Sequence, residues 1–284
     1  HDGEEFNLST ALRQTGTDFI FKWVFYTPML FLGVPPEIFV TVAALNLIYQ
    51  FWVHTEHIDR LGILDYIFVT PSNHRIHHAQ NKEYIDANYG GVFIIWDILF
   101  GTFKDEKKEL KPVYGTSKPL KSWNPFWANF EVWTEIFKDT WRTKSWKDKF
   151  RVWISRPKWR PKDVSEKYPI QKNDLKVFKK YDPKVTLFAK IFGFGQLVFG
   201  SFYSQAFFFN ASSMGSTEIF LIGVNVTMIL VFASLLFEGK AFGYRLEVVR
   251  ATLVLFAIYL GQFEFMQLTV LIHALICGVL ACLL

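Results

Sequence analysis

The chain has 284 residues, of which 51% are hydrophobic and 18% aromatic, and its formal net charge is +5 at pH 7. This composition is too apolar for an ordinary globular domain, and it excludes a disordered chain. The two cysteines, Cys277 and Cys282, are too few for a disulfide scaffold or a cysteine-based zinc site. We therefore expect an all-α integral membrane protein, built as a bundle of several spanning helices.

The N-terminal part combines a short polar start with a long apolar block. Residues 7–10 (NLST) have the pattern of a capped entry into a short amphipathic helix. Phe19 to Val53 is apolar, but three prolines and Glu37 divide it into uncharged pieces of 14 and 16 residues. We expect a tight hairpin or a re-entrant pair here, because broken backbone at membrane depth must be screened by protein.

Residues 54–103 are polar and rich in His, Asp, Asn and Gly, so chemistry is expected there first. His74, His77 and His78 have the spacing i, i+3, i+4, which on a helix places all three imidazoles on one face. Neutral imidazole is a ligand for iron, zinc, copper or nickel. The pattern favours metal coordination over a solvated helix face.

Two more histidines, His54 and His57, lie where the apolar block ends. Nearness to the triad favours His54 as a further ligand, whereas for His57 a ligand and a solvated side chain remain equal alternatives. His273 stands alone in the last apolar stretch, and we expect a hydrogen-bonded core residue there.

Acidic residues near the histidines could orient the ring N–H groups, as is usual around a bound metal. The candidates are Glu56, Asp59, Asp86 and Asp97. For Glu56, an ion pair with Arg60 at i+4 on a helix surface is an equal alternative. Residues 86–91 (DANYGG) have the composition of a turn.

The segment from Lys104 to Lys184 is strongly basic. It carries 22 of the 31 Lys and Arg, 11 of the 26 acids and seven of the ten tryptophans. Basic charge interleaved with Trp is typical of a surface at lipid headgroups. We expect membrane lipid as its partner, and no nucleic acid, because apolar stretches flank it.

Three uncharged stretches lie after the basic segment: residues 191–209, 219–237 and 265–284. Each has about the 20 residues that an apolar helix needs to cross a bilayer. If the basic segment lies in the cytosol, the first stretch crosses the membrane away from the cytosol and the second crosses back to it. The connection after residue 237 is expected on the cytosolic side, because its Lys240, Arg245 and Arg250 outnumber its two nearby glutamates.

Several of these sequence motifs resemble those of a known enzyme superfamily. The run 74–78 (HRIHH), preceded by His54 and followed by residues 86–90 (DANYG) and 95–103, resembles the fatty acid hydroxylase superfamily of membrane di-iron enzymes. Within it, residues 7–14 (NLSTALRQ) and 49–56 (YQFWVHTE) are similar to the alkylglycerol monooxygenases. The resemblance is dense up to about residue 116. It predicts the C-terminal part of a catalytic domain over 1–116, an interfacial or cytosolic segment over 117–184 and membrane helices over 185–284.

The resemblance implies a set of iron ligands: His1, His54, His74, His77 and His78. It also implies supporting roles for Glu56, Asp86 and Asn88, but none for His57. The superfamily has three histidine clusters, of which only the last is whole in this sequence. His1 aligns with the closing histidine of the middle cluster, so we expect this chain alone to lack part of the iron site.

The activity that the resemblance implies is lipid hydroxylation at the cytosolic face of the endoplasmic reticulum membrane. Two irons would activate dioxygen, and tetrahydrobiopterin would supply electrons. The substrate would be an alkylglycerol ether lipid, hydroxylated at the carbon next to the ether oxygen to give a fatty aldehyde and a glycerol derivative.

Two alternatives stay open. One is a sterol or sphingolipid hydroxylase or desaturase of the same superfamily, with electrons from a cytochrome b5 system. The other is a membrane metal carrier without catalysis, whose histidines bind zinc.

Overall fold

The computed structural model describes residues 3–12, 18–156, 159–262 and 266–282. These residues are mostly helical, and their extended pairing is limited to two isolated bridges, Phe68 with Phe93 and Ala79 with Tyr114. The all-α prediction is therefore confirmed. The chain divides into two compact units: unit 1 is His1–Leu120 with Val132–Lys180, and unit 2 is Lys121–Glu131 with Tyr181–Leu284. The functional boundaries that we expected at 116 and 184 stay predictions.

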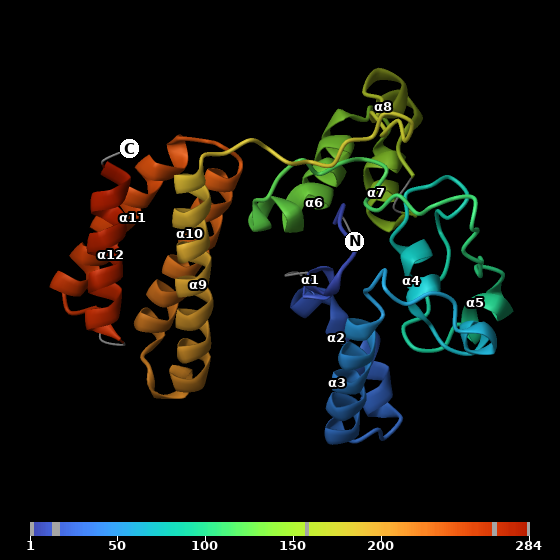
Figure 1. Ribbon diagram of the computed structural model, residues 1–284, viewed down its shortest axis with the longest axis horizontal. Coiled ribbons are helices and arrows are strands. Elements are labelled where there is room, and N and C mark those ends of the chain that lie inside the picture. The colour runs from blue at the N-terminus through green and yellow to red at the C-terminus, as the bar shows by residue number, and fades with distance from the viewer. Residues whose placement is uncertain (1–2, 13–17, 157–158, 263–265, 283–284) are drawn as a thin grey trace. The chain divides into compact units, whose positions relative to one another are not determined.

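The described residues of unit 1 form short and medium helices, and one further helix is shared with unit 2 (Figure 1). In chain order they are α1 (Leu8–Ala11), α2 (Asp18–Phe31), α3 (Pro36–Trp52), the 3-10 helix η1 (Gly62–Tyr66), α4 (Pro71–His77), α5 (Ile95–Phe100), the shared α6 (Pro125–Arg142), α7 (Trp146–Ile154) and α8 (Lys162–Lys167).

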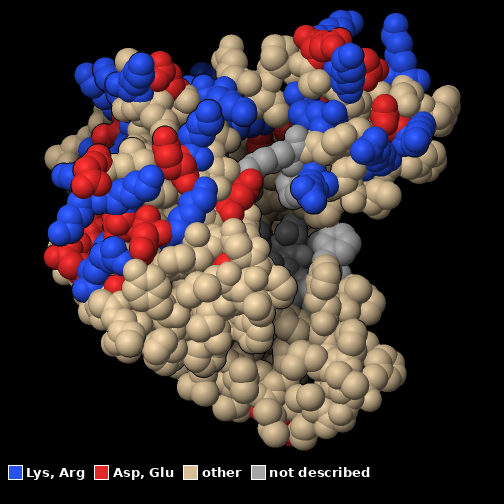
Figure 2. Space-filling model, turned by 90° about the vertical axis from the view of Figure 1, so that its right-hand side faces the viewer, with Lys and Arg blue, Asp and Glu red and all other residues tan. Residues whose placement is uncertain are grey.

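The first helices follow the predicted pattern. The Asn7 side chain accepts from the backbone N–H of Ser9 at 2.9 Å and caps α1. Helices α2 and α3 form the expected hairpin, in which the rings of Tyr26 and Phe39 lie 4.8 Å apart. Gly33 permits the turn, because its φ of +82° is unfavourable for residues with a Cβ. On the face drawn in Figure 2, the part where this hairpin lies carries few charged side chains.

The basic segment folds into defined structure around α6, α7 and α8. The Arg160 guanidinium donates to both carboxylate oxygens of the buried Asp139, at 2.6 and 2.7 Å. Asp163 accepts from the Thr143 hydroxyl at 3.1 Å and from the Lys144 backbone N–H at 2.9 Å. These bonds fix the corner between α6 and α7. The location of this segment at lipid headgroups stays a prediction.

Unit 2 is a bundle of four long helices (Figure 1): α9 (Leu187–Asn210), α10 (Ser216–Phe237), α11 (Phe242–Tyr259) and α12 (Gln267–Cys282), with a short 3-10 turn η2 (Ala211–Ser213). Two glycines let α9 approach α10. A Cβ on Gly193 would lie 2.9 Å from the Phe237 ring, and one on Gly200 would lie 3.2 Å from Ile229. Close packing through small residues is common between apolar helices.

Among the described residues, α10 is the one helix that is both long and apolar enough to cross a membrane. Helix α12 is apolar but, at 16 residues, shorter. The bounds of α10, Ser216–Phe237, agree with the predicted span 219–237. The remaining predicted spans stay part of a proposal.

The expectation that the chain between the second and third apolar stretches is a connection is wrong. It contains α11, and two of its charged residues, Glu247 and Arg250, lie buried inside the bundle. Arg250 donates to Glu247 at 2.9 Å and to the Asn225 side-chain oxygen at 2.7 Å, while Gln196 donates to Glu247 at 3.0 Å. Buried charges are tolerated when they are paired in this way. The count of charged residues in this segment led to the wrong expectation, because it treated Glu247 and Arg250 as exposed to solvent.

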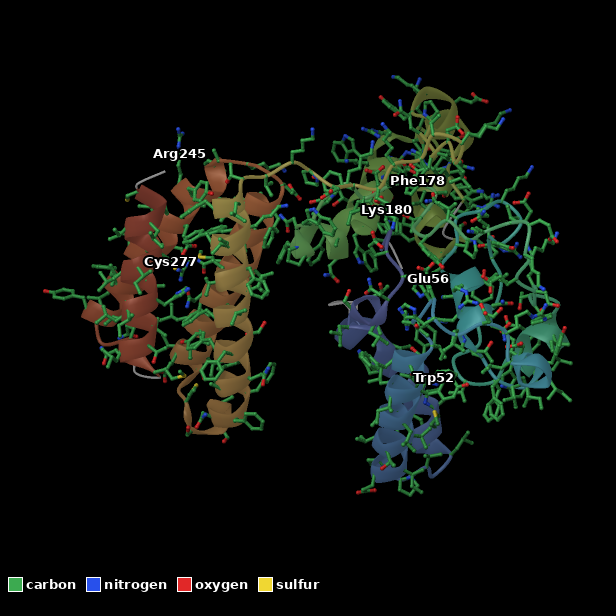
Figure 3. All side chains as sticks on the ribbon, viewed as in Figure 1. Trp52, Glu56, Phe178, Lys180, Arg245 and Cys277 are labelled. Atoms are coloured by element: carbon green, nitrogen blue, oxygen red, sulfur yellow. The ribbon has the colours of Figure 1, made fainter. Side chains whose placement is uncertain are left out.

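The last helix agrees with its prediction. His273 is partly buried, lies with its Nε2 atom 3.0 Å from the Gln196 side-chain oxygen, and stacks on Phe199 with 3.5 Å between ring centroids. Figure 3 shows Cys277 pointing into the bundle and Arg245 pointing away from it. His273 is therefore a hydrogen-bonded residue of the bundle interior, as expected.

Candidate metal centre

Helix α4 places two histidines one turn apart. Pro71 occupies its first turn, where a missing N–H costs nothing, and His78 ends it with a backbone N–H that reaches the His74 carbonyl at 3.2 Å. Residues four apart on a helix lie on the same face. His74 and His78 are therefore held side by side by the backbone itself.

Three buried imidazoles converge at this point. The Nε2 atom of His74 lies 3.1 Å from that of His54 and 3.2 Å from that of His78. One nitrogen of each ring lies within 4.8 Å of the other two. Three ring nitrogens that face one another cannot satisfy each other by hydrogen bonds, because each pair shares at most one proton. A metal cation at their centre would satisfy all three lone pairs, so these residues fit a metal.

The orientation of the His54 ring is set by backbone. Its Nδ1 atom lies 2.6 Å from the Gln50 carbonyl oxygen, which can only accept. Nδ1 therefore carries the proton, and the Nε2 lone pair faces the cluster. We expected an acid in this role, and a carbonyl one helical turn earlier fills it instead.

Burial lowers the pKa of His54, His74 and His78, and positive charge on the neighbouring rings lowers the pKa of His74 and His78 further. All three side chains are therefore neutral at pH 7. Neutral imidazole is the form that binds metals, so the metal does not have to displace a proton there.

The other predicted ligands differ in their placement. The ring of His77 lies 5.4 Å from those of His74 and His78, but its nitrogens are outside the convergent group. His57 is exposed and lies outside the convergent group. His1 lies outside the described residues.

Two aromatic rings cover the histidines. Phe6 is 4% exposed, and its ring centroid lies 5.5 Å from that of His54 and 5.4 Å from that of His78. Tyr114 stacks on the other side of Phe6 at 4.9 Å. Sequence reasoning missed both residues, because no local spacing links positions 6 and 114 to the histidines.

Arg75, which forms a partly buried ion pair with Glu106, joins α4 to the chain after His54. Arg75 lies 2.7 Å from Glu106 and donates to the carbonyl oxygens of Thr55 at 3.1 Å and Ile58 at 2.9 Å. It therefore holds the segment that carries His54 against the helix that carries His74. Arg75 lies within the histidine motif, but its partner is 31 residues further on, so the sequence did not reveal the pair.

Glu56 supports the site indirectly. It accepts a hydrogen bond from the Tyr114 hydroxyl at 2.7 Å, which fixes the ring that stacks on Phe6. The alternative pairing with Arg60 is wrong, because Arg60 lies 2.7 Å from Asp105 and the chain around Glu56 is not helical. Figure 3 shows Trp52 at the end of α3 and Glu56 shortly after it.

Asn88 fastens the loop after α4. Its amide donates to the carbonyl oxygens of Asn73 at 3.1 Å and Lys104 at 2.9 Å, and its side-chain oxygen accepts from the Lys104 N–H at 2.9 Å. Asp86 and Asn88 both have positive φ, of 59° and 53°, which confirms the turn. Asp86 is exposed.

Among the described residues, the remaining two candidate acids form no hydrogen bond with the ring nitrogens of the three convergent histidines. Asp97 accepts from the backbone N–H groups of Tyr89 and Gly90, both at 2.7 Å, and from the Thr102 hydroxyl at 2.6 Å. Asp59 is exposed.

Comparisons with known proteins identify proteins to which this chain is similar. A model of the fatty acid hydroxylase family matches residues 1–102. An alkylglycerol monooxygenase of Xenopus tropicalis is 35% identical over 268 residues, which are 94% of this chain and 58% of that protein. The alkylglycerol monooxygenase of Homo sapiens is 44% identical over 161 residues, which are 57% of this chain and 36% of that protein.

A bacterial relative acts on a different lipid according to its name. The ornithine lipid hydroxylase OlsE of Rhizobium tropici is 38% identical over 76 residues, which are 27% of this chain and 23% of that protein. The chain thus spans less than two thirds of the length of each of these relatives. No solved structure matches the chain.

Proposed function

We propose that this chain, whose residues 1–102 belong to the fatty acid hydroxylase family, is part of a membrane monooxygenase that cleaves alkylglycerol ether lipids. One observation carries the proposal: the ring nitrogens of His54, His74 and His78 converge at a buried point. A relative whose match covers this region is named alkylglycerol monooxygenase. The family and the apolar helix α10 together indicate a membrane protein.

In the proposed centre, His54, His74 and His78 would hold iron, and His77 and His1 would be the further ligands of the two irons. Bound iron would supply the activation of dioxygen. The chain's own residues do the positioning: the Gln50 carbonyl holds the Nδ1 proton of His54, and Phe6 keeps water from the rings that it covers.

The proposed reaction inserts one oxygen atom into the C–H bond next to the ether oxygen. The second oxygen atom leaves as water, with two electrons from tetrahydrobiopterin and two protons. The hemiacetal that results collapses to a fatty aldehyde and a glycerol derivative. The protein's contribution is to hold the reacting carbon in place and to keep the site dry.

The proposed setting is the endoplasmic reticulum membrane, crossed several times, with the histidines facing the cytosol. The apolar bundle of α9 to α12 lies in the bilayer, and the basic segment 104–184 lies at its cytosolic surface. The excess of positive charge in that segment supports this orientation. So do its exposed tryptophans, of which Trp141 is 87% and Trp146 75% exposed.

The test expresses the protein in membranes as its gene encodes it, loads iron, and supplies an alkylglycerol, dioxygen and tetrahydrobiopterin. We expect release of a fatty aldehyde. Absence of aldehyde from protein that retains iron would refute the substrate assignment. Replacing the pterin by a cytochrome b5 reducing system separates this activity from the sterol, sphingolipid and desaturase alternatives.

A second candidate, hydroxylation of a lipid without an ether bond, is favoured by the similarity to an ornithine lipid hydroxylase. The same assay with ornithine lipid would then give a hydroxylated lipid and no aldehyde. Metal content distinguishes both hydroxylase candidates from a membrane metal carrier. A metal carrier would be isolated with exchangeable zinc.

A further inference from the structure

A hollow of about 800 Å³ lies in unit 2, between α9, α10 and the chain segments that precede α6 and α9. Its volume is within the range of about 300 to 1,000 Å³ that is usual for ligand sites. It contains none of the residues of the histidine cluster, so the proposed function leaves it without a role.

The two ends of this hollow differ in chemistry. Its mouth is formed by Trp123, Asp182 and Lys190, and its body by Phe194, Leu197 and Leu230. Lys190 and Leu197 are seven residues apart on α9, so the apolar part extends about 10 Å along the helix from the charged end. Trp and charged side chains above an apolar slot are the arrangement of a membrane interface.

The mouth carries one positive and one negative group that do not neutralise each other. Lys190 and Asp182 are both exposed. Among the residues that the structure describes, neither side chain forms an ion pair, with the other or with a third residue. A ligand with separated opposite charges would complement both groups, its anion near Lys190 and its cation near Asp182 and the Trp123 face.

Hydrogen bonds and an ion pair hold the mouth of the hollow in a fixed arrangement. Glu238, at the end of α10, accepts from the Ser122 hydroxyl and from the Trp123 backbone N–H, both at 2.6 Å. Its carboxylate also pairs with Lys240 at 2.5 Å. Although burial opposes ionisation, these bonds lower the pKa of Glu238, so it is charged at pH 7. The segment that carries Trp123 is therefore fixed to the helix that lines the slot.

We propose that this hollow binds a zwitterionic glycerophospholipid, with one acyl chain in the slot between α9 and α10. Its phosphate lies near Lys190, and its ammonium or choline group lies near Asp182 and Trp123. The inference rests on the membrane setting proposed above for α9 to α12, but not on iron or on turnover. The site would select this class of lipid from the bilayer around the protein.

The experiment offers the purified protein three lipids in equal amount, in mixed micelles: phosphatidylcholine, phosphatidylglycerol and diacylglycerol. Native mass spectrometry counts the lipid that remains bound. We expect phosphatidylcholine to be retained in preference to the other two. Leu197→Trp, which fills the slot, should lower this occupancy about tenfold, a loss of about 1.4 kcal/mol.

Matched variants separate the site from general lipid adhesion. Val198→Trp changes the neighbouring exposed residue outside the hollow and should retain the lipid. Lys190→Gln and Asp182→Asn should each remove the preference for phosphatidylcholine over diacylglycerol. Arg245→Gln should not, because Arg245 is exposed, points away from the bundle in Figure 3 and does not line the hollow.

Equal retention of all three lipids would overturn the proposal, and so would equal losses in Leu197→Trp and Val198→Trp. Lys190→Gln keeps the test decisive if the tryptophan variant fails to fold, because it changes only an exposed side chain. Phosphatidylcholine that binds as expected while no aldehyde forms would refute the proposed function and leave this site standing.

Discussion

At the residue scale, His54 shows how the site is organised by contacts that sequence spacing does not reveal. Its spacing to the triad predicted a ligand, and the structure brings its Nε2 atom to 3.1 Å from that of His74. The group that orients it is the Gln50 carbonyl, and a backbone atom carries no residue-type signal. The grouping of His54 with the triad could therefore be predicted from the sequence, whereas its ring orientation could not.

Replacing His78 by Ala should strongly reduce iron retention, because it removes one of three convergent nitrogens. His57→Ala is the matched control, since its side chain is exposed and outside the cluster. Elemental analysis of the purified variants measures the effect. Equal iron content in the two variants would show that the cluster is not the metal site.

The metal-free protein should become less stable as the pH falls below about 6.5, the unfolded histidine pKa. The pKa values of His54, His74 and His78 are lowered in the folded state, so acid protonates the unfolded state first. Thermal unfolding at pH 7.5 and 5.5 measures this, and His78→Leu should show a smaller difference. A midpoint that rises on acidification would contradict the prediction.

Tyr114→Phe should cost about 1 kcal/mol of stability, because it removes the hydroxyl that donates to Glu56 but keeps the ring that stacks on Phe6. Combining it with Glu56→Ala should add little to the loss in Glu56→Ala alone, since either change removes the same hydrogen bond. Chemical unfolding of the single and double variants checks this. Fully additive losses would mean that the two groups do not interact.

At the element scale, the structure corrects the sequence at α11. Apolar length predicted α10 within three residues at its start, and the proline positions predicted the α2–α3 hairpin. Helix α11 was missed because Glu247 and Arg250 interrupt its apolar run. They are paired with each other three residues apart on the same helix, and the burial of this pair among the neighbouring helices cannot be derived from local composition.

Glu247→Gln alone should destabilise unit 2 by about 3 to 5 kcal/mol, because it leaves the Arg250 charge buried without its counter-charge. The double variant Glu247→Leu with Arg250→Met should recover most of this loss. Thermal unfolding in detergent compares the three proteins. A double variant as unstable as the single one would mean that the pair contributes net stability.

Gly193→Ala should destabilise the α9–α10 contact by about 1 to 3 kcal/mol, because the new Cβ would lie 2.9 Å from the Phe237 ring. Gly195→Ala is the control on the same helix. Its Cβ would meet nothing within 4 Å, so the helix preference of alanine should make it neutral or slightly stabilising. Identical unfolding midpoints for the two variants would refute the packing argument.

At the scale of the whole molecule, composition predicted an apolar helical chain, and histidine spacing predicted imidazoles that the structure brings together. What the sequence could not provide are the contacts between distant segments. The contact of Phe6 with His54 joins residues 48 positions apart, and the ion pair of Arg75 with Glu106 joins residues 31 positions apart. Only the folded structure reveals these contacts. The charged end of the hollow in unit 2 likewise combines residues from three separate segments.

The most direct test of the account is the iron K-edge X-ray absorption spectrum of the purified, iron-loaded protein. If His54, His74 and His78 hold the metal, the spectrum will show a first shell of nitrogen atoms and the outer-shell multiple scattering of several imidazole rings, and this signature will weaken in His54→Ala. A shell without imidazole, or a spectrum unchanged in that variant, would contradict the proposed metal centre.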